Sequence, residues 1–349
     1  MRRVLGLWAG MALTFSMAAC VAGPGVSGSA EGSSSASARA SASTGATHSE
    51  GASPSASPTW ENPAEGLAMV MFPEPGSPVS HVFVVGADGE LEQVTGVSRE
   101  SPGVDYPDWS PDHTQLVVGP PKVGAGLQLD IAIVNADGSD ERVVAEGLKA
   151  WWSPDGARLL IESWDYAIDL PEPLRILNVA RERVRDLAEG FNGQWLSADS
   201  VGFQQGTSVM ITTLSGEAQA LPELEGVEPH WSPDGSSMLF LHEGQIYLAD
   251  GVGAGARPLV EGSAPVWAPD GSRFAFSPGI NSDAIPLTAV ADLDGNVLWS
   301  DVAGQGVTWS PDSTRLAVEV PFPEPTVYVL DAASGEALWE SPGQHPAWN

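Results

Sequence analysis

The sequence predicts an all-β protein, a seven-bladed β-propeller closed by its C-terminal strand and preceded by an N-terminal signal and a disordered linker. Three observations lead to this prediction. A tryptophan followed by a tight-turn sequence recurs along the chain, short runs of apolar and β-branched residues follow each copy, and the two ends of the repeat region are complementary pieces of one unit. A period near 40 residues with strand-like content is typical of propeller blades.

The repeated element is a tryptophan followed by Ser-Pro-Asp-Gly or a close variant. It occurs as YPDWSPDHTQLVV, KAWWSPDGARLLI, NGQWLSADSVGF, EPHWSPDGSSMLF, APVWAPDGSRFAF and GVTWSPDSTRLAV, and the final HPAWN supplies one more tryptophan. Successive repeat tryptophans are 43, 43, 36, 36, 42 and 39 residues apart. They are Trp109, Trp152, Trp195, Trp231, Trp267, Trp309 and Trp348.

Each unit is expected to contain four antiparallel strands. The residues that end in tryptophan form the first strand, and the Ser-Pro-Asp-Gly turn follows, with proline fixing φ and aspartate bonding to the local backbone. A second strand such as 158–161, a third such as DIAIVNADG and a fourth such as ERVVAE complete the unit. His113, Ser200 and Ser313 replace the turn glycine, so those three turns are predicted to be strained or of another type.

The count of units gives seven blades. Six complete units begin at Trp109 and at the five repeat tryptophans that follow it. Residues 66–96 hold the second, third and fourth strands of another blade without a first strand, and HPAWN holds a first strand with nothing after it. The two fragments are expected to pair, which closes the ring and leaves no open sheet edge.

The N-terminal segment predicts export. Residues 1–3 are Met-Arg-Arg, and a 14-residue apolar run follows, which is short for a membrane span and suits an export signal. The run ends in Met-Ala-Ala-Cys at residues 17–20, which resembles the bacterial lipobox, although Met17 stands where leucine is usual. That resemblance implies cleavage before Cys20 and a diacylglycerol on its thiol, whose two acyl chains suffice for stable anchoring. An ordinary secretory signal is the alternative.

The domain organisation follows from composition. Residues 1–19 are predicted to be a lipoprotein signal peptide, and residues 20–58, almost all Ser, Ala, Gly and Pro, a disordered tether. Residues 59–349 are the propeller, expected to be an extracytoplasmic monomer anchored to the bacterial cell membrane. The chain has 45 acidic and 15 basic residues, a net charge of −30, which disfavours nucleic acid as a partner.

The tryptophan-centred repeats resemble those of TolB-type, WD-repeat-like propellers over about residues 64–349. The resemblance is specific for the fold and weak for function. TolB combines a six-bladed propeller with a separate α/β domain, so its partnership with a peptidoglycan-associated lipoprotein does not carry over. Similar repeats precede the hydrolase domain of prolyl-oligopeptidase-like enzymes, and no hydrolase domain follows here. LDAASGEALWE and ADLDGNVLWS resemble quinoprotein-type repeats, but Trp299 and Trp339 are interpreted as packing residues and no cofactor is expected.

Motifs for catalysis or metal binding are weak in the sequence. It contains no G-x-S-x-G, H-E-x-x-H, P-loop or dinucleotide fingerprint. Asp292, Asp294 and Asn296 resemble the start of a calcium loop without its final glutamate, so a hairpin turn is the better interpretation. Asp165 and Asp169 are a weak candidate for contact with a cation. No catalytic residue and no metal ligand are assigned.

The central channel offers the best candidate site. If the repeat tryptophans pack between blades, the residues one and three positions before each tryptophan share the opposite strand face. These two rows vary from blade to blade, as an asymmetric polar ligand would require. The candidate ligand-binding residues at the channel mouth are Tyr106, Asp108, Lys149, Trp151, Asn192, Gln194, Glu228, His230, Thr308 and His345. A water-filled channel without a ligand is the alternative.

Two functional hypotheses remain open. The first is a non-catalytic binding or scaffolding module for a peptide, a protein or an envelope saccharide. The second is a propeller enzyme, a hydrolase or lyase acting on a saccharide or lactone, in which Asp108, Glu228, His230 and His345 form an acid–base or metal cluster. A scaffold whose partners contact the outer edges is a further form of the first. Fold alone does not decide between them.

Overall fold

The structure, a computed structural model, describes residues 62–72, 79–95, 99–100, 106–119, 130–165, 170–225 and 227–348. All of these residues lie within Pro58–Asn349, one of the two units into which the chain divides. The described residues form strands and turns without a helix, so no helix among them could cross a membrane. Residues 1–57, with Cys20 and the predicted signal, and Asp169 lie outside the described residues, as does the Asp165 side chain.

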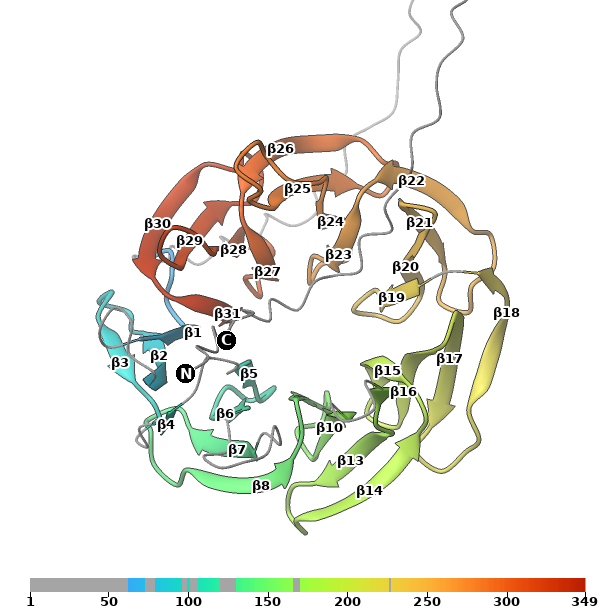
Figure 1. The fold of residues 1–349 in the computed structure, drawn as a ribbon, viewed down its shortest axis with the longest axis horizontal. Helices are drawn as coiled ribbons and strands as arrows, with labels where there is room; N and C mark the ends of the chain where they lie inside the picture. The colour runs from blue at the N-terminus through green and yellow to red at the C-terminus, as the bar shows by residue number, and fades with distance from the viewer. Residues whose placement is uncertain are drawn as a thin grey trace, which may run out of the picture. The chain divides into compact units, whose positions relative to one another are not determined.

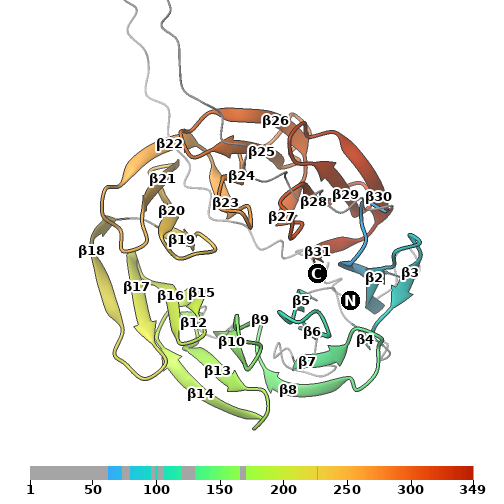
Figure 2. The same cartoon turned by 180° about the vertical axis from the view of Figure 1, so that it is seen from behind.

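Seven antiparallel sheets form a closed ring (Figure 1). Blade 1 has the strand order β31-β1-β2-β3, with a short β4 also paired to β2. The other blades follow chain order from the inside outward, as Figure 2 shows from the opposite side. The strands of blades 1 to 3 are β1 (Leu67–Met71), β2 (Val79–Val85), β3 (Leu91–Gln93), β4 (Arg99–Glu100) and β31 (Gln344–Trp348); β5 (Asp108–Trp109), β6 (Gln115–Val118), β7 (Asp130–Asn135) and β8 (Arg142–Glu146); β9 (Lys149–Trp152), β10 (Arg158–Glu162), β13 (Leu174–Asn178) and β14 (Arg183–Ala188).

The remaining four blades each contain four consecutive strands. They are β15 (Phe191–Ser197), β16 (Ser200–Gln205), β17 (Ser208–Thr213) and β18 (Gln219–Glu225); β19 (Val227–Trp231), β20 (Ser237–His242), β21 (Gln245–Asp250) and β22 (Arg257–Glu261); β23 (Ser263–Trp267), β24 (Arg273–Ser277), β25 (Leu287–Asp292) and β26 (Val297–Ala303); β27 (Gln305–Trp309), β28 (Arg315–Val320), β29 (Thr326–Asp331) and β30 (Ala337–Pro342). A two-stranded insertion in blade 3 pairs β11 (Trp164–Asp165) with β12 (Leu170–Pro171).

The C-terminal strand closes the ring, as the sequence predicted. In β31, Trp348 pairs with Leu67 of β1 and Ala347 with Ala68. The indole N–H of Trp348 also donates to the carbonyl of Glu65 at 3.2 Å. Blade 1 therefore takes its innermost strand from one end of the described chain and its other strands from the opposite end.

The apolar core consists of seven clusters, and each lies where two adjacent blades meet. The cluster between blades 1 and 2, for example, joins Val70 and Val82 to Trp109 and Leu116. Every cluster contains or contacts the repeat tryptophan of its second blade. Because a buried indole removes about 150–250 Å² from water, these residues hold neighbouring blades together, and the packing role predicted for them is confirmed.

In blades 2, 3, 5, 6 and 7 the turn after the repeat tryptophan is held by its aspartate, as expected from the sequence. In blade 3, Asp155 accepts hydrogen bonds from the Ser153 hydroxyl at 2.6 Å and the Ala157 N–H at 3.1 Å. Gly156 has a φ of 67°, and the two replacements His113 and Ser313 adopt the same left-handed conformation at 58° and 60°. L-residues with a side chain are strained at such angles. Ser200 is instead the first residue of β16, so its turn differs in type.

Candidate functional site

The first strand of most blades contains a β-bulge close to its start. Pairing shifts three residues before the repeat tryptophan in blades 4 to 7, and blade 1 shows the same irregularity. The residue at this position has a positive φ in each case. The five are Asn192 (52°), Glu228 (54°), Ala264 (49°), Gly306 (61°) and His345 (50°). A bulge turns a side chain and a backbone N–H away from the regular ladder. The simple alternation assumed from the sequence therefore does not hold at this position.

Polar side chains of the preceding blade accept the N–H groups that the bulges expose. Glu162 at the end of β10 accepts from the Asn192 N–H at 2.9 Å, and also from Gly193. Glu319 of β28 accepts from the N–H of His345 at 2.9 Å. These acceptors were not among the residues predicted from the sequence. A glutamate that interrupts an apolar second strand, as in Arg315–Val320, was the available signal.

Gln204 of β16 forms the third such contact. Its side-chain oxygen accepts from the N–H of Glu228 at 3.0 Å and from the Asn192 amide at 3.3 Å. Its side-chain nitrogen donates to the carbonyl of Gly206 at 2.8 Å. The side chain is 4% exposed, so its hydrogen bonds fix the bulges of blades 4 and 5 relative to each other.

The remaining contacts join blades 7, 1, 2 and 3. The rings of Tyr106 and His345 lie with centroids 4.6 Å apart, and the Lys149 ammonium lies 4.3 Å from the centre of the Tyr106 ring. Lys149 pairs across the ladder with Glu162. The Nδ1 atom of His345 lies 3.7 Å from Oε2 of Glu319.

Together these residues form one continuous series of side-chain and backbone contacts over six of the seven blades, from blade 7 through blade 1 to blade 5. We call this set the mouth cluster. Its members are, in spatial order, Glu319, His345, Tyr106, Lys149, Glu162, Asn192, Gln204 and Glu228. All lie near the start of a first strand or the end of a second strand, and the first strands surround the ring axis (Figure 1). We call this side of the ring the mouth face, and the side that carries the Ser-Pro-Asp turns the turn face.

Burial governs the charges of the mouth cluster. It lowers the pKa of Lys149 below 10.5, and the nearby Glu162 carboxylate opposes that shift. Burial, with a smaller contribution from Lys149, lowers the pKa of His345 to about 4, so this imidazole is neutral at pH 7. Burial raises the pKa of Glu162, Glu228 and Glu319 above the ordinary value. The three carboxyl groups face a single ammonium group within the cluster.

Glu228 differs from the other two glutamates. Backbone N–H groups donate to the carboxylates of Glu162 and Glu319 and favour their charged forms, whereas the pKa of Glu228 is raised by burial alone. Its Oε2 atom is buried and has no hydrogen-bond partner. An unsatisfied buried carboxyl oxygen costs about 1–3 kcal/mol, so it is a point at which a ligand with a donor would gain free energy.

The residues directly before the repeat tryptophans contact the next blade. Asp108 accepts from the backbone N–H of Trp152 at 2.9 Å. The Gln194 amide accepts from the N–H of Trp231 at 2.9 Å and donates to its carbonyl at 3.0 Å. The structure thus places these two predicted site residues at blade junctions.

The residues directly before the repeat tryptophans also supply backbone carbonyl acceptors for the indole N–H groups of the next blade. Trp195 donates to the carbonyl of Trp151 at 3.1 Å, and Trp267 donates to that of His230 at 2.8 Å. The Trp151 ring packs against the core between blades 3 and 4, and Thr308 is half-buried in β27. Burial lowers the pKa of His230 to about 4.

Within the described residues, no group of three or more His, Cys, Asp or Glu side chains has the geometry of a metal site. Asp292 accepts from the N–H groups of Asp294 at 3.0 Å and Asn296 at 2.8 Å. These bonds belong to the hairpin between β25 and β26, so the interpretation of this segment as a turn is confirmed.

Comparison with known proteins identifies the fold. No protein-family model and no curated protein matches the chain. Among solved structures, the oligogalacturonate lyase of Vibrio parahaemolyticus is similar, with 13% identity, a TM-score of 0.57 and coverage of 76% of this chain and 91% of the other. An oligogalacturonate lyase in complex with manganese is 14% identical, with a TM-score of 0.52 and coverage of 78% of this chain and 85% of the other. A 6-phosphogluconolactonase-like protein from Bacteroides uniformis is 11% identical, with a TM-score of 0.55 and coverage of 80% of this chain and 97% of the other.

At these identities the likeness shows the fold and leaves activity open. The similar structures are propeller proteins, in agreement with the repeats from which the sequence predicted a TolB-like propeller. The blade order, the closing strand and these comparisons lead to one conclusion: the chain is a seven-bladed β-propeller.

Proposed function

We propose that the chain is a lipid-anchored, extracytoplasmic binding module whose propeller takes a polar ligand at the mouth face without transforming it. The observation that supports this proposal is the mouth cluster, in which eight polar and aromatic residues of six blades are linked by side-chain contacts, hydrogen bonds to backbone N–H groups and one strand pairing. Glu162, Gln204 and Glu319 fix the backbone of the adjacent bulges, so the surface is pre-formed. Pre-formed sites with a few placed polar groups are typical of small-ligand recognition.

The charges of the cluster restrict the class of ligand. Glu162, Glu228 and Glu319 outnumber the one ammonium group, Lys149, and His345 is neutral at pH 7. Like charges repel strongly at short range in a partly buried site. A neutral saccharide or a basic peptide therefore suits the mouth better than a polyanionic saccharide.

Binding is tested by isothermal titration of the full chain, purified in detergent, with a chitin tetrasaccharide, a tetragalacturonate and a tetralysine peptide. We expect the neutral or the basic probe to bind and the acidic probe to fail. Glu228→Gln keeps the shape of the side chain and removes its charge, and should weaken binding by about tenfold. Glu243→Gln makes the same change at an exposed glutamate in the turn between β20 and β21 and is the control.

The enzyme hypothesis predicts another outcome of the same experiment. Hydrolysis or elimination of a bound saccharide would release new chain ends, which chromatography of the titrated mixture detects. Turnover that His345→Gln abolishes would contradict the proposal and favour the enzyme, whereas binding without product supports it. No binding by any of the three probes would contradict the assignment of the mouth face.

The anchor is tested independently. In a bacterial host, the full chain is expected in the membrane fraction and should incorporate labelled fatty acid. Cys20→Ala should abolish labelling and release the propeller from the membrane fraction. A labelled Cys20→Ala variant, or an unlabelled parent chain that is cleaved and secreted, would contradict lipidation at Cys20.

A further inference from the structure

Three blades send an arginine across to the next blade. Arg158, Arg273 and Arg315 are the first residues of β10, β24 and β28, directly before the residue that pairs with the repeat tryptophan. The guanidinium of each donates to a backbone carbonyl of the following blade. The acceptors are Ala198 at 3.2 Å, Ser313 at 2.7 Å and Pro63 at 3.1 Å, respectively.

Arg273 shows the aromatic and carbonyl contacts of this position. Its guanidinium carbon lies 5.4 Å from the centre of the Trp309 ring, the repeat tryptophan of the next blade. It also donates to the carbonyl of Ala332 at 3.4 Å. Arg158 also contacts a carboxylate in the turn of its own blade, because its Nη1 lies 3.2 Å from Oδ2 of Asp155. An aromatic face, a carbonyl of the next blade and a turn carboxylate therefore surround this guanidinium position.

The other four blades have a different residue at the arginine position. It is Gly66, Ser200 and Ser237 in blades 1, 4 and 5, and blade 2 also lacks the arginine. The corresponding residue is Gln115, the first residue of β6 and directly before Leu116, which pairs with Trp109. Its amide nitrogen donates to Asn135 of its own blade at 3.0 Å. The side chain of Gln115 thus bonds within blade 2 and does not occupy the position at which an arginine would contact blade 3.

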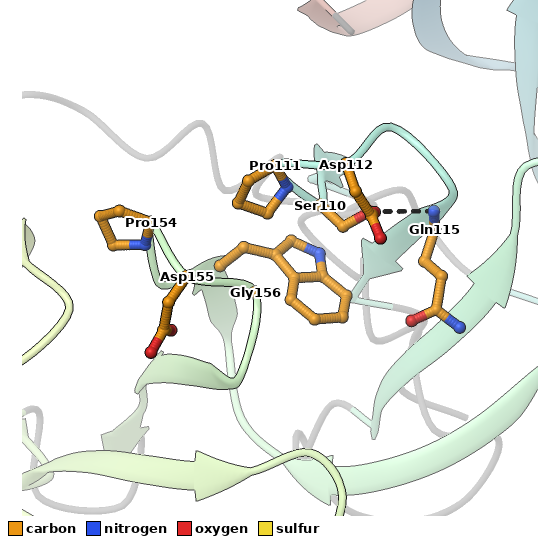
Figure 3. A pocket seen from close by; sticks show the side chains of 8 residues that line it. Ser110, Pro111, Asp112, Gln115, Pro154, Asp155 and Gly156 are labelled. Atoms are coloured by element: carbon orange, nitrogen blue, oxygen red, sulfur yellow. Dashed lines mark hydrogen bonds between the residues drawn. The ribbon is translucent and has the colours of Figure 1, made fainter.

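A pocket of about 230 Å³ lies at this junction on the turn face (Figure 3). Figure 3 shows Asp112 and Gln115 on one side of it and Pro154 and Asp155 on the other. The pocket is lined by Ser110, Pro111, Asp112, Gln115, Trp152, Pro154, Asp155 and Gly156. It is built from the two turns that flank the missing arginine.

The lining matches the surroundings of the internal arginines. Trp152 is the repeat tryptophan of blade 3 and corresponds to Trp309, over which Arg273 lies. Gly156 corresponds in its turn to Ser313, whose carbonyl accepts from Arg273. Asp112 corresponds to Asp155, the turn carboxylate that contacts Arg158. The pocket therefore presents all three kinds of group that hold a guanidinium elsewhere in the ring.

Two further features point to an arginine within a peptide. Trp152 is 7% exposed, and its indole N–H has no hydrogen-bond partner. The matching indoles of blades 4, 6 and 7 donate to a backbone carbonyl, so Trp152 lacks an acceptor that they have. Hydrogen bonds to their turns lower the pKa of Asp112 and Asp155, so both are charged at neutral pH. A net charge of −30 also attracts basic segments.

We propose that the pocket between the turns of blades 2 and 3 binds the arginine side chain of a basic peptide segment in a partner protein. The guanidinium takes the position that Arg158, Arg273 and Arg315 occupy at their own junctions. Arginine suits the pocket better than lysine, because its planar group stacks on an indole while it donates to a carboxylate and a carbonyl. This site lies on the opposite face from the mouth cluster and does not depend on it.

The test is isothermal titration of the full chain with the blocked peptides acetyl-Ala-Arg-Ala-amide and acetyl-Ala-Lys-Ala-amide. We expect the arginine peptide to bind about tenfold or more tightly than the lysine peptide. Gln115→Arg places the missing arginine inside the pocket and should abolish binding while the melting temperature is unchanged or higher. Gln219→Arg adds the same charge at an exposed position of β18 and should bind as the parent does.

The other outcomes overturn the proposal. Equal affinity for the two peptides would mean attraction by acidic groups without recognition of a guanidinium. Binding that persists in a folded Gln115→Arg chain would place the peptide elsewhere, and no binding to the parent would exclude the site. If Gln115→Arg fails to fold, Asp112→Asn takes its place, with an expected loss of about tenfold or more.

Discussion

The carboxylate of Asp108 accepts a hydrogen bond from the backbone N–H of Trp152, at 2.9 Å across the junction of blades 2 and 3. The Gln194 side chain makes the same contact to Trp231 at the junction of blades 4 and 5, with an uncharged amide. Burial raises the pKa of Asp108 to about 7, and the Trp152 N–H opposes the shift only in part. The same hydrogen bond across a blade junction is thus made by a carboxylate in one place and by an amide in another, and only the carboxylate titrates.

Asp108→Asn is expected to flatten the pH dependence of stability between about pH 4 and pH 7. A raised pKa means that the folded chain binds a proton that the unfolded chain has released, so the contribution of Asp108 to stability falls as pH rises through this range. Asparagine can still accept from the Trp152 N–H. At pH 8 the variant should be more stable than the parent by on the order of 2 kcal/mol, measured by urea unfolding at several pH values.

Gln194→Glu supplies the reverse test of the same contact. A carboxylate placed at the junction of blades 4 and 5 should introduce a loss of stability as pH rises, as Asp108 does at its own junction. Parallel pH profiles of Asp108→Asn and the parent would contradict the role assigned to Asp108. An unchanged profile in Gln194→Glu would contradict it as well.

Trp231→Ala should destabilise the fold by about 3–5 kcal/mol, as large-to-small changes in packed cores do. Trp231 is 2% exposed and lies in the core between blades 4 and 5. Urea unfolding measures the loss, and Leu298→Ala, at a side chain that is 48% exposed, is the control. Any ligand preference of the mouth should persist in the variant at low temperature. Unchanged stability with altered binding would contradict the packing role.

Gly202→Ala should destabilise the chain through the same indole. A Cβ atom at this position would lie 2.4 Å from ring carbons of Trp231, closer than any non-bonded contact allows. We expect a loss of about 1–3 kcal/mol from overpacking. The double variant Gly202→Ala/Trp231→Leu should lose less stability than the sum of the losses of the two single variants, because the smaller side chain at position 231 removes the clash. Strict additivity would show that the strain lies elsewhere.

Arg273→Gln recreates in blade 6 the residue found in blade 2. It removes the hydrogen bond to the Ser313 carbonyl and the stacking on Trp309. The expected cost is about 1–3 kcal/mol in urea unfolding. Arg183→Gln, at an exposed position of β14, carries the same change of charge and should cost little. Equal effects of the two variants would mean that the cross-blade arginine has no special role.

Lys149 should titrate below 10.5, since burial lowers its pKa. Reductive methylation with ¹³C-formaldehyde followed by NMR resolves the two lysines, and Lys122→Arg assigns the signal of Lys149. Glu162→Gln removes the carboxylate that opposes the shift, so the pKa of Lys149 should fall further. A rise in Glu162→Gln, or titration at the ordinary value in the parent, would contradict the description of the mouth cluster.

The fold could be predicted from the sequence because its information is local and repeated. The tryptophan, its turn and the apolar second strand recur in register, and the fragments at residues 66–96 and 345–349 fit one blade. Each element depends on nearby residues, as in the bonds that Asp155 makes within its own turn. Seven copies of one local rule suffice to set the architecture.

The site could be predicted only in part. Of the ten candidate residues, Tyr106, Lys149, Asn192, Glu228 and His345 belong to the mouth cluster. The sequence does not predict the bulges, because a pattern of regular strand alternation contains no sign of the residues with positive φ that interrupt it. The acceptors Glu162, Gln204 and Glu319 come from second strands of neighbouring blades, and a contact between blades leaves no spacing rule in the sequence.

The pairing of β31 with β1 also sets an order of events in the making of the protein. Residues 67–70 of β1 are completely buried in the finished ring, and on a growing polypeptide they emerge long before residues 344–348 exist to cover them. An apolar strand with an unpaired edge is prone to associate with other chains. The first blade to begin is therefore the last to be completed, and until then the nascent protein depends on whatever shields that strand.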